Sequence, residues 1–545
     1  MPNIRTHYIN TFERVHAYMK AFLKKYYTWI YLFFAILITI QVLFIQPMPG
    51  VADQGDFQRI MIVTGLYEDE NTIKNSEILF FRYVKNKYNM APTNPLRLLG
   101  IIPTTSMIYP ISLVKIICSV GASKIFNTEI LAAVYATFYL ASLFLCLKWL
   151  KIKKLSTIIV LTITSLFIVL DGNYLVWFNS LYGEPMMITG LLLFIASILN
   201  VSNKITINNA DILFVVISSF LFLGSKIQCI TSLPFFIVMI VKCFTLKYKN
   251  TSDMTFPLCI KTQHCSVRKG FSLTFTSAVL ITTALIVFYT LGIYLQVNST
   301  CGVDTKYNSV FYGILKNSKN PQRDLEMLGL SKDMAIEAGK HAYLPKDEYA
   351  KYVPWSDITQ KEFNEKISNA RIIKFYILNP DRLINGMKYT AAQSFQTSSF
   401  LGKYKITDVS EYTFSFKRFT IWSDLREKLF PKKLWFIIMF YSMIIIVTLM
   451  EYTDAYNKIL KRTAGVKNNS IKLKIELIWL IAAIGIFQFP MPYLGNGEAD
   501  TSKQLFLFNY TFDLLVLVSI NYLIYHLLKI TKKYLRLLSR PNFNR

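Results

Sequence analysis

Long apolar runs separated by short basic segments set the pattern of this chain. About ten of these runs approach the length that an α-helix needs to cross a bilayer. They cover residues 29–45, 130–147, 155–170, 186–201, 212–223, 230–244, 271–296, 434–449, 475–490 and 505–528. The pattern therefore predicts an all-α polytopic membrane protein with a bundle of about ten transmembrane helices.

Lysine and arginine gather in the segments between these runs. Several Lys or Arg residues lie in each of the segments 1–28, 148–154, 242–249 and 529–536. Because cytoplasmic segments of membrane proteins carry an excess of Lys and Arg, we expect these segments and both termini on the cytoplasmic side of the cell membrane. The first apolar run lacks a small-residue cleavage signal, so we expect it to be retained as a span.

The first outer loop is expected over residues 46–128. Its second half, 96–120, is apolar but is interrupted by Pro103 and Pro110 and contains Lys115. This composition favours helices that lie at the outer interface over a clean span.

A second polar stretch, 297–433, is charged and aromatic and has no apolar run of membrane length. We expect it to be a mostly helical extracytoplasmic domain, with one amphipathic helix over 359–378. The expected units are thus a transmembrane region 1–296, this domain, and a second transmembrane region 434–545.

Composition supports the membrane class and narrows the partners. Hydrophobic residues make up 53% of the chain and charged residues 17%, and the formal net charge is +27. Most of the excess charge lies in the basic segments, as the positive-inside pattern requires, so we expect no nucleic-acid partner. The seven Cys are scattered and the five His do not cluster, so we expect no metal site built from them.

The stretch 51–59, which reads V-A-D-Q-G-D-F-Q-R, carries the first candidate chemistry. Asp53 and Asp56 follow directly on the first span, and Arg59 comes one helical turn after Asp56. Carboxylates this close to a bilayer are costly unless water, a partner or a substrate meets them. The alternative is a solvated turn, since D-Q-G-D is a good turn sequence.

Further charged residues fall at helix ends that this topology places on the same outer side. They are Asp171, Glu184, Lys226, Glu498, Asp500 and Lys503. Together with the acidic stretch they could line one outward-facing cavity, where carboxylates activate a hydroxyl and Lys or Arg hold a phosphate. Simpler roles stay open: Glu184 could cap the helix that follows it, and Lys226 could reach toward the interface.

Five motifs, taken in order, resemble a bacterial glycan-biosynthesis hexose transferase family, similar to the GT-C glycosyltransferases. They are A-D-Q-G-D-F-Q-R (52–59), W-F-N-S-L-Y-G-E-P (177–185), G-S-K-I-Q (224–228), N-S-V-F-Y-G-I-L (308–315) with L-G-L (328–330), and A-D-T-S-K-Q-L-F-L-F-N (499–509). The resemblance runs over most of the chain. It implies a GT-C-like membrane enzyme that transfers a hexose from a polyprenyl-phosphate donor to a cell-surface glycan or lipid-linked acceptor.

The resemblance also implies roles for individual residues. It gives the catalytic role to Asp53 or Asp56, and we favour Asp53 as the base because it lies nearer the first span. It implies donor-phosphate binding by Arg59, Lys226, Gln228 and Lys503, and substrate binding by Asn179, Tyr182, Glu184 and Asp500. The spacing D-x-x-D differs from the D-x-D of some GT-C members; no metal ligands are assigned, and a divalent cation such as Mg²⁺ or Mn²⁺ stays open as a cofactor.

Two other classes of function remain. A transporter or flippase of lipid-linked glycans would need ionisable residues in the middle of its spans, and the predicted spans are nearly free of charge. A non-catalytic assembly partner could be built around the outer domain.

Overall fold

The computed structural model describes residues 2–121, 123–252, 265–396, 399–460 and 466–538, and it is mostly helical. Within these residues seven helices are long and apolar enough to cross a membrane, or eight if the bent pair Leu155–Val169 and Gly172–Phe178 forms one span. The seven are His16–Leu43, Thr128–Leu150, Glu184–Ser202, Ile227–Tyr248, Phe275–Gln296, Leu434–Asn457 and Phe506–Lys532.

The sequence predicted about ten spans, which is more than the helices of the described residues support by their length and composition. When the bent pair is counted as one span, two expected spans account for the difference. The helix over 212–223 is short, with 15 residues in all, and the helix over 475–490 carries Lys472, Lys474 and Glu476 in its first half.

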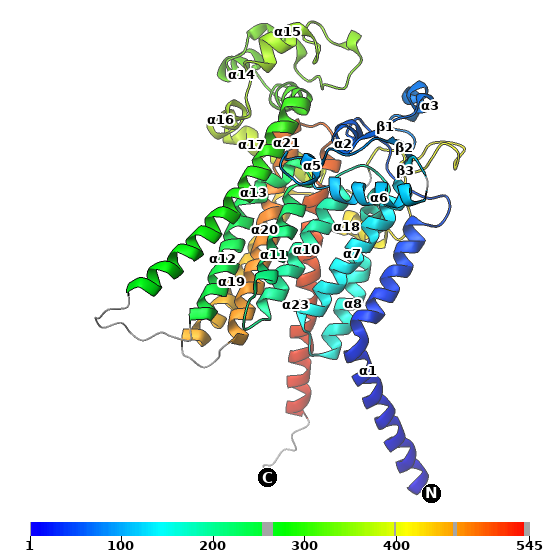
Figure 1. Cartoon of the computed structure of the whole chain (residues 1–545), viewed down its shortest axis with the longest axis vertical. Coiled ribbons are helices and arrows are strands. Elements are labelled where there is room, and N and C mark those ends of the chain that lie inside the picture. The colour runs from blue at the N-terminus through cyan, green and yellow to red at the C-terminus, as the bar shows by residue number, and fades with distance from the viewer. Residues whose placement is uncertain (1, 122, 253–264, 397–398, 461–465, 539–545) are drawn as a thin grey trace.

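The long helices run side by side in one bundle (Figure 1). They are α1 (Pro2–Leu43), α7 (Thr128–Leu150), α8 (Leu155–Val169), α10 (Glu184–Ser202), α11 (Asn209–Leu223), α12 (Leu233–Ser252), α13 (Cys265–Tyr307), α19 (Leu434–Leu460), α20 (Val466–Gln488) and α23 (Phe506–Leu538). Helix α10 is the most enclosed, with nearly all of its side chains buried. The start of α1 and the end of α23 lie at the same end of the bundle (Figure 1); we call the opposite end the loop end.

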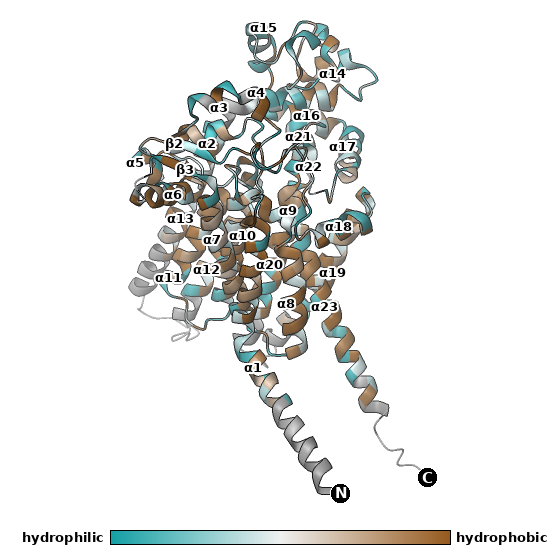
Figure 2. Cartoon of the chain, turned by 90° about the vertical axis from the view of Figure 1, so that its right-hand side faces the viewer, coloured by the Kyte–Doolittle hydropathy of each residue, from teal (hydrophilic) through white to brown (hydrophobic). Residues whose placement is uncertain are grey.

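Hydropathy differs between the bundle and the loop end. Figure 2 shows apolar residues concentrated along the bundle and polar residues concentrated beyond the loop end. Such a distribution is stable when lipid covers the apolar sides of the bundle, because lipid does not penalise exposed Ile, Leu and Phe.

The loop between α1 and α7 folds over the loop end and contains a small sheet. Strands β1 (Leu66–Tyr67), β2 (Lys87–Met90) and β3 (Ile125–Asn127) pair antiparallel in the order β1-β2-β3. The all-α prediction was therefore incomplete. Strands of two to four residues are too short to show an alternating pattern, so only pairing between distant parts of the loop creates them.

Five short helices complete this loop: α2 (Phe57–Thr64), α3 (Glu70–Lys74), α4 (Ser76–Leu79), α5 (Pro95–Leu98) and α6 (Ile108–Val120). Helix α6 has 13 residues, too few to span a bilayer, and lies across the bundle axis (Figure 1). One side of it is buried while Ile116 and Val120 are exposed. This agrees with the expectation that 96–120 holds no clean span, and its position at the interface stays a prediction.

Beyond the end of α13 the chain forms a helical domain with its own hydrophobic core. Its elements are η3 (Asn308–Ile314), α14 (Pro321–Leu328), η4 (Lys332–Glu337), η5 (Lys346–Glu348), α15 (Asp357–Thr359), η6 (Gln360–Asn364), α16 (Asn369–Leu378) and α17 (Pro380–Ala392). The core groups Phe311, Leu325, Tyr352, Phe375 and their neighbours with Tyr493 from a later loop.

The single helix expected over 359–378 is wrong in detail, because the chain breaks after η6 and restarts at α16. Ser368 caps the restart by accepting the N–H of Arg371 at 3.3 Å, which makes a new helix start favourable there. After α17 the chain returns to the main core through Phe395, Leu401 and Phe416, and α18 (Ile421–Leu429) leads into α19.

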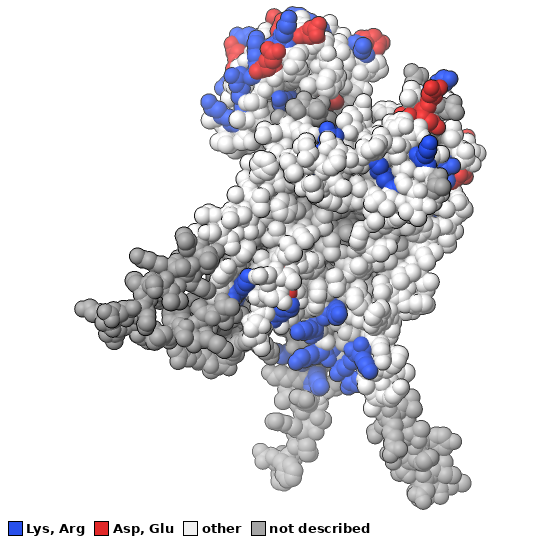
Figure 3. All heavy atoms as spheres, viewed as in Figure 1, with Lys and Arg blue, Asp and Glu red and all other residues white. Residues whose placement is uncertain are grey.

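Charge is distributed unequally between the two ends of the molecule. Figure 3 shows Lys and Arg gathered at the end of the bundle opposite the loop end, and mixed charges beyond the loop end. The basic end includes the end of α7 and the turn between α7 and α8, together residues 148–154.

Candidate functional site

The stretch 51–59 is held at the loop end by its own backbone and by Asp53. The N–H groups of Gly50 and Ala52 donate to the carbonyls of Lys403 and Gly402, both at 2.9 Å. One oxygen of Asp53 accepts the N–H groups of Gly55 at 2.8 Å and Phe57 at 3.2 Å. These two bonds fix the turn that starts α2, as side-chain caps do.

Asp53 is buried, and burial raises the pKa of its carboxyl against the lowering effect of the two backbone bonds. It does not line the adjacent cavity described below. The geometry therefore makes Asp53 a support for the turn.

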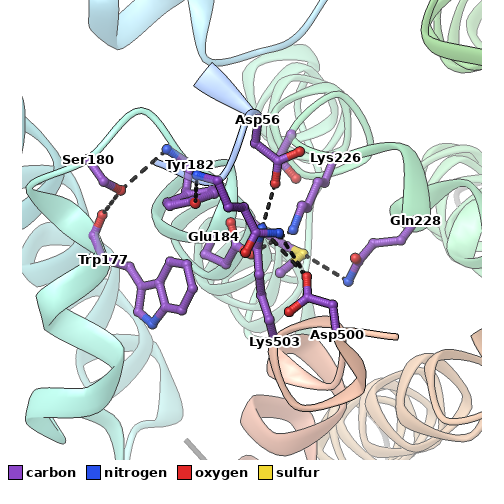
Figure 4. Close-up of polar contacts among 12 residues, drawn as sticks. Asp56, Trp177, Ser180, Tyr182, Glu184, Lys226, Gln228, Asp500 and Lys503 are labelled. Atoms are coloured by element: carbon purple, nitrogen blue, oxygen red, sulfur yellow. Dashed lines mark hydrogen bonds and ion pairs between the residues drawn. The ribbon is translucent and has the colours of Figure 1, made fainter. Parts of the chain in front are cut away.

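Asp56 lies at the centre of an ion-pair cluster (Figure 4). Its two oxygens meet Arg59 at 2.8 Å and the Nζ of Lys503 at 2.6 Å. Desolvation acts to raise the pKa of Asp56, but the charges of Lys503, Arg59 and Lys226 outweigh it and hold the pKa well below its usual range. Asp56 is therefore ionised throughout the physiological pH range.

Lys503 comes from α22 (Thr501–Gln504) and is nearly inaccessible, with 2% of its side chain exposed against 28% for Asp56. Desolvation acts to lower its pKa, but the neighbouring carboxylates Asp56, Asp500 and Glu184 raise it above the usual value. Its ammonium also lies 4.4 Å from the ring centre of Tyr182, a cation–π contact.

Asp500 completes the group on the far side of Lys503. It lies 3.9 Å from the Lys503 ammonium and accepts a 2.8 Å hydrogen bond from the side chain of Gln54. Its backbone has φ +53°, a left-handed conformation that is uncommon for residues other than Gly and Asn. Burial raises the pKa of Asp500.

Tyr182 ties the acidic stretch to the motif 177–185. Its hydroxyl donates to the Ala52 carbonyl at 3.0 Å and accepts the N–H of Gln54 at 3.1 Å. Its ring packs edge-on against Phe57 and Trp177. Tyr182 therefore positions the backbone around Asp53, and its ring contacts the Lys503 ammonium.

Glu184 and Lys226 form a second pair beside the first (Figure 4). They are joined at 2.6 Å, with 0% of the Glu184 side chain and 14% of the Lys226 side chain exposed. Glu184 stands in the first turn of α10, where the helix dipole favours a carboxylate. Its second oxygen has no hydrogen-bond partner among the described residues, so Lys226 is its main compensation.

A cavity of about 300 Å³ opens beside these pairs. Its charged residues are Asp56, Arg59 and Lys226, and its other polar residues include Gln58, Tyr182, Thr104 and Ser225. Its apolar part is formed by Ile60, Ile62, Val63, Met107, Leu181, Ile227 and Ile293. One carboxylate, two cations and an extended apolar wall therefore face the same space, at the boundary between the bundle and the loop end.

The side chains of two predicted site residues form hydrogen bonds outside the ion-pair cluster. Asn179 uses its amide within the fold, donating to the Pro49 carbonyl at 2.8 Å and accepting from Thr128 at 2.6 Å. Gln228 donates to Gln488 at 3.2 Å. Of the ten residues named from the sequence, the structure gathers Asp56, Arg59, Tyr182, Glu184, Lys226, Asp500 and Lys503 into one cluster, with Asp53 supporting it.

Sequence reasoning missed a buried network in the same region. Arg426 from α18 pairs with Asp513 of α23, and the hydroxyl of Tyr174 donates to Asp513 at 2.6 Å. Asp513 lies inside a candidate span, so the expectation of spans nearly free of charge has an exception here. The signal was Asp513 itself, an acid within the last apolar run.

Lys403 was also missed. It is 2% exposed, donates to Ser399 at 2.8 Å and lies 5.7 Å from the ring of Trp177. Burial lowers the pKa of this lysine to about 7. A lysine in a polar stretch gives no sequence signal of such burial.

Among the described residues no group of three or more His, Cys, Asp or Glu side chains is arranged to hold a metal ion. The carboxylates of the cluster are instead paired with Lys and Arg. The arrangement suits an anionic ligand group that competes for these cations.

The apolar helices and the polar cluster at one end of them define a multi-pass membrane protein. A family model described as the YfdI N-terminal transmembrane domain matches residues 15–539, and the chain belongs to this family. Comparisons with curated proteins and with solved structures gave no significant match. The family description names a transmembrane domain and no reaction, so the membrane part of the expectation is confirmed and the transferase part stays a prediction.

Proposed function

We propose that this protein is a GT-C-type glycosyltransferase that moves a hexose from a polyprenyl-phosphate donor to a glycan or lipid-linked acceptor on the outer face of the membrane. The observation that carries the proposal is the cavity, which joins a carboxylate and two cations to an apolar wall at the membrane boundary. A lipid-linked sugar phosphate has the same sequence of parts: polar sugar, charged phosphate and apolar chain.

The cations of the cavity suit the phosphate of the donor. When the sugar leaves, the bond between the anomeric carbon and the phosphate oxygen breaks, and its electron pair stays on the phosphate. Lys226 and Arg59, which both line the cavity, can stabilise that charge. The apolar residues Ile62, Val63 and Ile293 would face the first units of the lipid chain.

The carboxylate of the cavity suits the acceptor hydroxyl. Asp56 would take the hydroxyl proton as the hydroxyl oxygen attacks the anomeric carbon. In the free protein its low pKa makes it a weak base, because Lys503 and Arg59 hold it. A donor phosphate in the cavity would draw Arg59 and Lys226 toward itself and would raise the pKa of Asp56 by like charge, so the base is strengthened when donor is bound. We therefore assign the base to Asp56 and a positioning role to Asp53.

The position of the site supports the outer face. The site lies at the loop end, and Lys and Arg gather at the opposite end of the bundle (Figure 3). Under the positive-inside rule this distribution supports a cytoplasmic basic end and therefore an outer position for the site. Nucleotide sugars are absent there, so a lipid-linked donor is the fitting sugar source.

The test uses the purified protein in lipid nanodiscs with polyprenyl-phosphate glucose, galactose and mannose, each radiolabelled in the sugar, and membranes from cells that lack the protein as the acceptor source. Wild type should transfer label from one donor. Asp56→Asn should lower the rate of sugar transfer at least about 100-fold, within the usual range for loss of a general base.

Asp53 supplies the matched control. Asp53→Asn keeps an oxygen that can accept the N–H groups of Gly55 and Phe57, so it should keep most of the activity, whereas Asp53→Ala should lose both activity and stability. Absence of transfer from every donor, or full activity of Asp56→Asn, would overturn the proposal.

A transporter of lipid-linked glycans is the second candidate, and the Arg426–Asp513 pair favours it, since ionisable residues inside spans often mark transport pathways. Arg426 is 1% exposed and also donates to the Phe395 carbonyl at 3.1 Å and to Tyr174 at 2.7 Å, a closed set of contacts that suits a structural lock. Movement of a fluorescent lipid-linked sugar across proteoliposome membranes without change in its bonds would support transport.

A further inference from the structure

Helix α18 presents a stripe of large apolar side chains that the described part of the chain leaves exposed. Ile421, Leu425 and Leu429 follow one another at intervals of four residues, so they lie on one side of the helix. Their exposed fractions are 55%, 44% and 68%. Three neighbouring aliphatic side chains are unfavourable in water, so we expect an apolar surrounding to cover this stripe.

The opposite face of α18 is fixed to the bundle. Ser423 and Arg426 are each 1% exposed. The N–H of Ser423 donates to Asp171 at 2.9 Å, and the side chain of Asn173 donates to the Ser423 hydroxyl at 2.8 Å. Arg426 pairs with Asp513. Because these contacts hold the buried face at positions one helical turn apart, they also fix the direction of the exposed stripe, which points away from the bundle.

The same contacts place α18 at the height where three apolar helices begin or end. Asp171 closely follows the last residue of α8, and Asp513 lies in the first turns of the candidate span Phe506–Lys532. The end of α18 is separated only by residues 430–433 from the start of the candidate span Leu434–Asn457. Figure 2 shows α18 at the side of the molecule, at the level where the apolar bundle meets the polar loop end. The stripe therefore stands at the boundary that the membrane surface is expected to occupy.

An exposed apolar surface continues from α18 onto α19. Trp435, Ile438 and Met439 are 58%, 58% and 49% exposed, and they belong to the candidate span whose outer side lipid covers. Tryptophan is also enriched where acyl chains meet headgroups. Since residues 430–433 alone separate the two exposed faces, lipid that covers the start of α19 lies next to α18.

Lysines border this apolar surface. The segment 417–433 carries four lysines against two carboxylates: Lys417, Lys428, Lys432 and Lys433, and Asp424 and Glu427. Lys428 and Lys433 are exposed, and Lys428 follows Leu425 by three positions, which places it on the same side of the helix. Ammonium groups beside an apolar stripe match an anionic phospholipid, whose phosphate lies directly above its acyl chains.

We propose that α18 lies in the membrane interface at the loop end, with Ile421, Leu425 and Leu429 among the acyl chains and the neighbouring lysines on the phosphates of anionic phospholipids. A protein partner fits less well, because a stable protein interface takes roughly 20–30 residues a side. The pair Arg426–Asp513 then joins the membrane-bound helix to the bundle. The inference goes beyond the proposed function and does not depend on it.

Fluorescence quenching by labelled lipid tests the apolar stripe. The full chain carries Leu425→Cys, labelled with nitrobenzoxadiazole, in nanodiscs of phosphatidylcholine and phosphatidylglycerol with or without a nitroxide on the acyl chain. Ile336→Cys is the matched control, since Ile336 is also aliphatic and 59% exposed but belongs to η4 of the helical domain. Labelled wild type gives the signal of the native cysteines, which is subtracted.

The nitroxide should quench the label at 425 at least about threefold more strongly than the label at 336, because an interfacial helix lies about 5–10 Å deep in the headgroup and acyl boundary. Leu429→Cys repeats the measurement one turn further along α18 and should give the same result. Equal quenching at the control and at α18 would overturn the inference. A label on α18 that is shielded from water but not quenched would also overturn it, because a protein partner or a second copy then covers the stripe.

A triple variant tests the lysines. The combined substitutions Lys428→Gln, Lys432→Gln and Lys433→Gln should lower the amount of phosphatidylglycerol that co-purifies with the protein at least about threefold, as measured by mass spectrometry. The control triple removes exposed lysines of the helical domain and should retain as much of this lipid as wild type; it carries Lys332→Gln, Lys361→Gln and Lys366→Gln. Equal retention by wild type and both triple variants would overturn the assignment of anionic phospholipid.

Discussion

The ion pair between Asp56 and Lys503 should be energetically coupled, and a double-mutant cycle measures this. At 2.6 Å and an effective dielectric constant of about 20, the gross attraction is about 6 kcal/mol. Desolvation of Lys503 and the 28% exposure of Asp56 offset most of it, so we expect a net coupling of about 1–3 kcal/mol.

The two single variants should differ because their burial differs. Asp56→Asn leaves the buried Lys503 ammonium with Asp500 at 3.9 Å, and should destabilise by about 2–4 kcal/mol. Lys503→Met leaves Asp56 paired with Arg59 at 2.8 Å, and should destabilise by about 1–2 kcal/mol. The double variant should be less destabilised than the sum of the two by the coupling energy.

Unfolding in an SDS titration, followed by tryptophan fluorescence, gives the free energy of unfolding for all four proteins. The matched control is the pair Lys332 and Glu326, which also lies at 2.6 Å but is more than half exposed on both sides, and should show coupling below about 0.5 kcal/mol. If the coupling between Asp56 and Lys503 is also below that value, the two side chains do not form a close, desolvated ion pair.

Three further predictions follow from single contacts. Lys226→Met should raise the KM for donor at least about tenfold, because it removes a phosphate contact and leaves Glu184 unpaired. Lys226→Arg should keep part of the donor binding, and steady-state kinetics measure the KM of both variants. The pKa of Lys403 is about 7 in the fold and 10.5 in the unfolded chain, so the unfolded state binds more protons between these pH values. The contribution of Lys403 should therefore raise the free energy of unfolding by about 2 kcal/mol from pH 7 to pH 9. Lys403→Met should remove that rise in a series of thermal unfolding measurements. Gly402→Ala would place a Cβ 1.7 Å from a backbone carbonyl oxygen and should destabilise by about 2 kcal/mol or more, whereas Gly495→Ala meets nothing within 4 Å and should not lower the melting temperature.

The sequence predicted the parts of this fold that depend on local composition. The apolar runs located the long helices, because roughly 20 apolar residues in a row are stable in lipid and in few other places. The prolines of 96–120 indicated that this segment is not a clean span, because proline is tolerated only at the start of a helix; α6 begins at Ile108, with Pro110 in its first turn, and has 13 residues. The small sheet could not be predicted, because its strands are defined by pairing between distant segments.

For the candidate site too, the sequence predicted the residues but not the contacts between them. Residue type and position at helix ends were enough to name Asp56, Lys226 and Lys503 as candidates. Their pairing was not predictable, because Asp56 and Lys503 are 447 positions apart and meet only when α22 packs against the acidic stretch. The preference for Asp53 as base rested on its distance from the span, whereas its actual environment depends on where one carboxylate oxygen points.

The sequence by itself thus determined that this is a multi-pass membrane protein and which polar residues stand at the ends of its helices. These are local properties, since hydropathy acts on each segment separately. Only the tertiary structure decided which of these residues share a cavity, and that Asp53 supports a turn while Asp56 faces the cavity. These depend on contacts between distant segments, whose geometry is set by the packing of the whole chain.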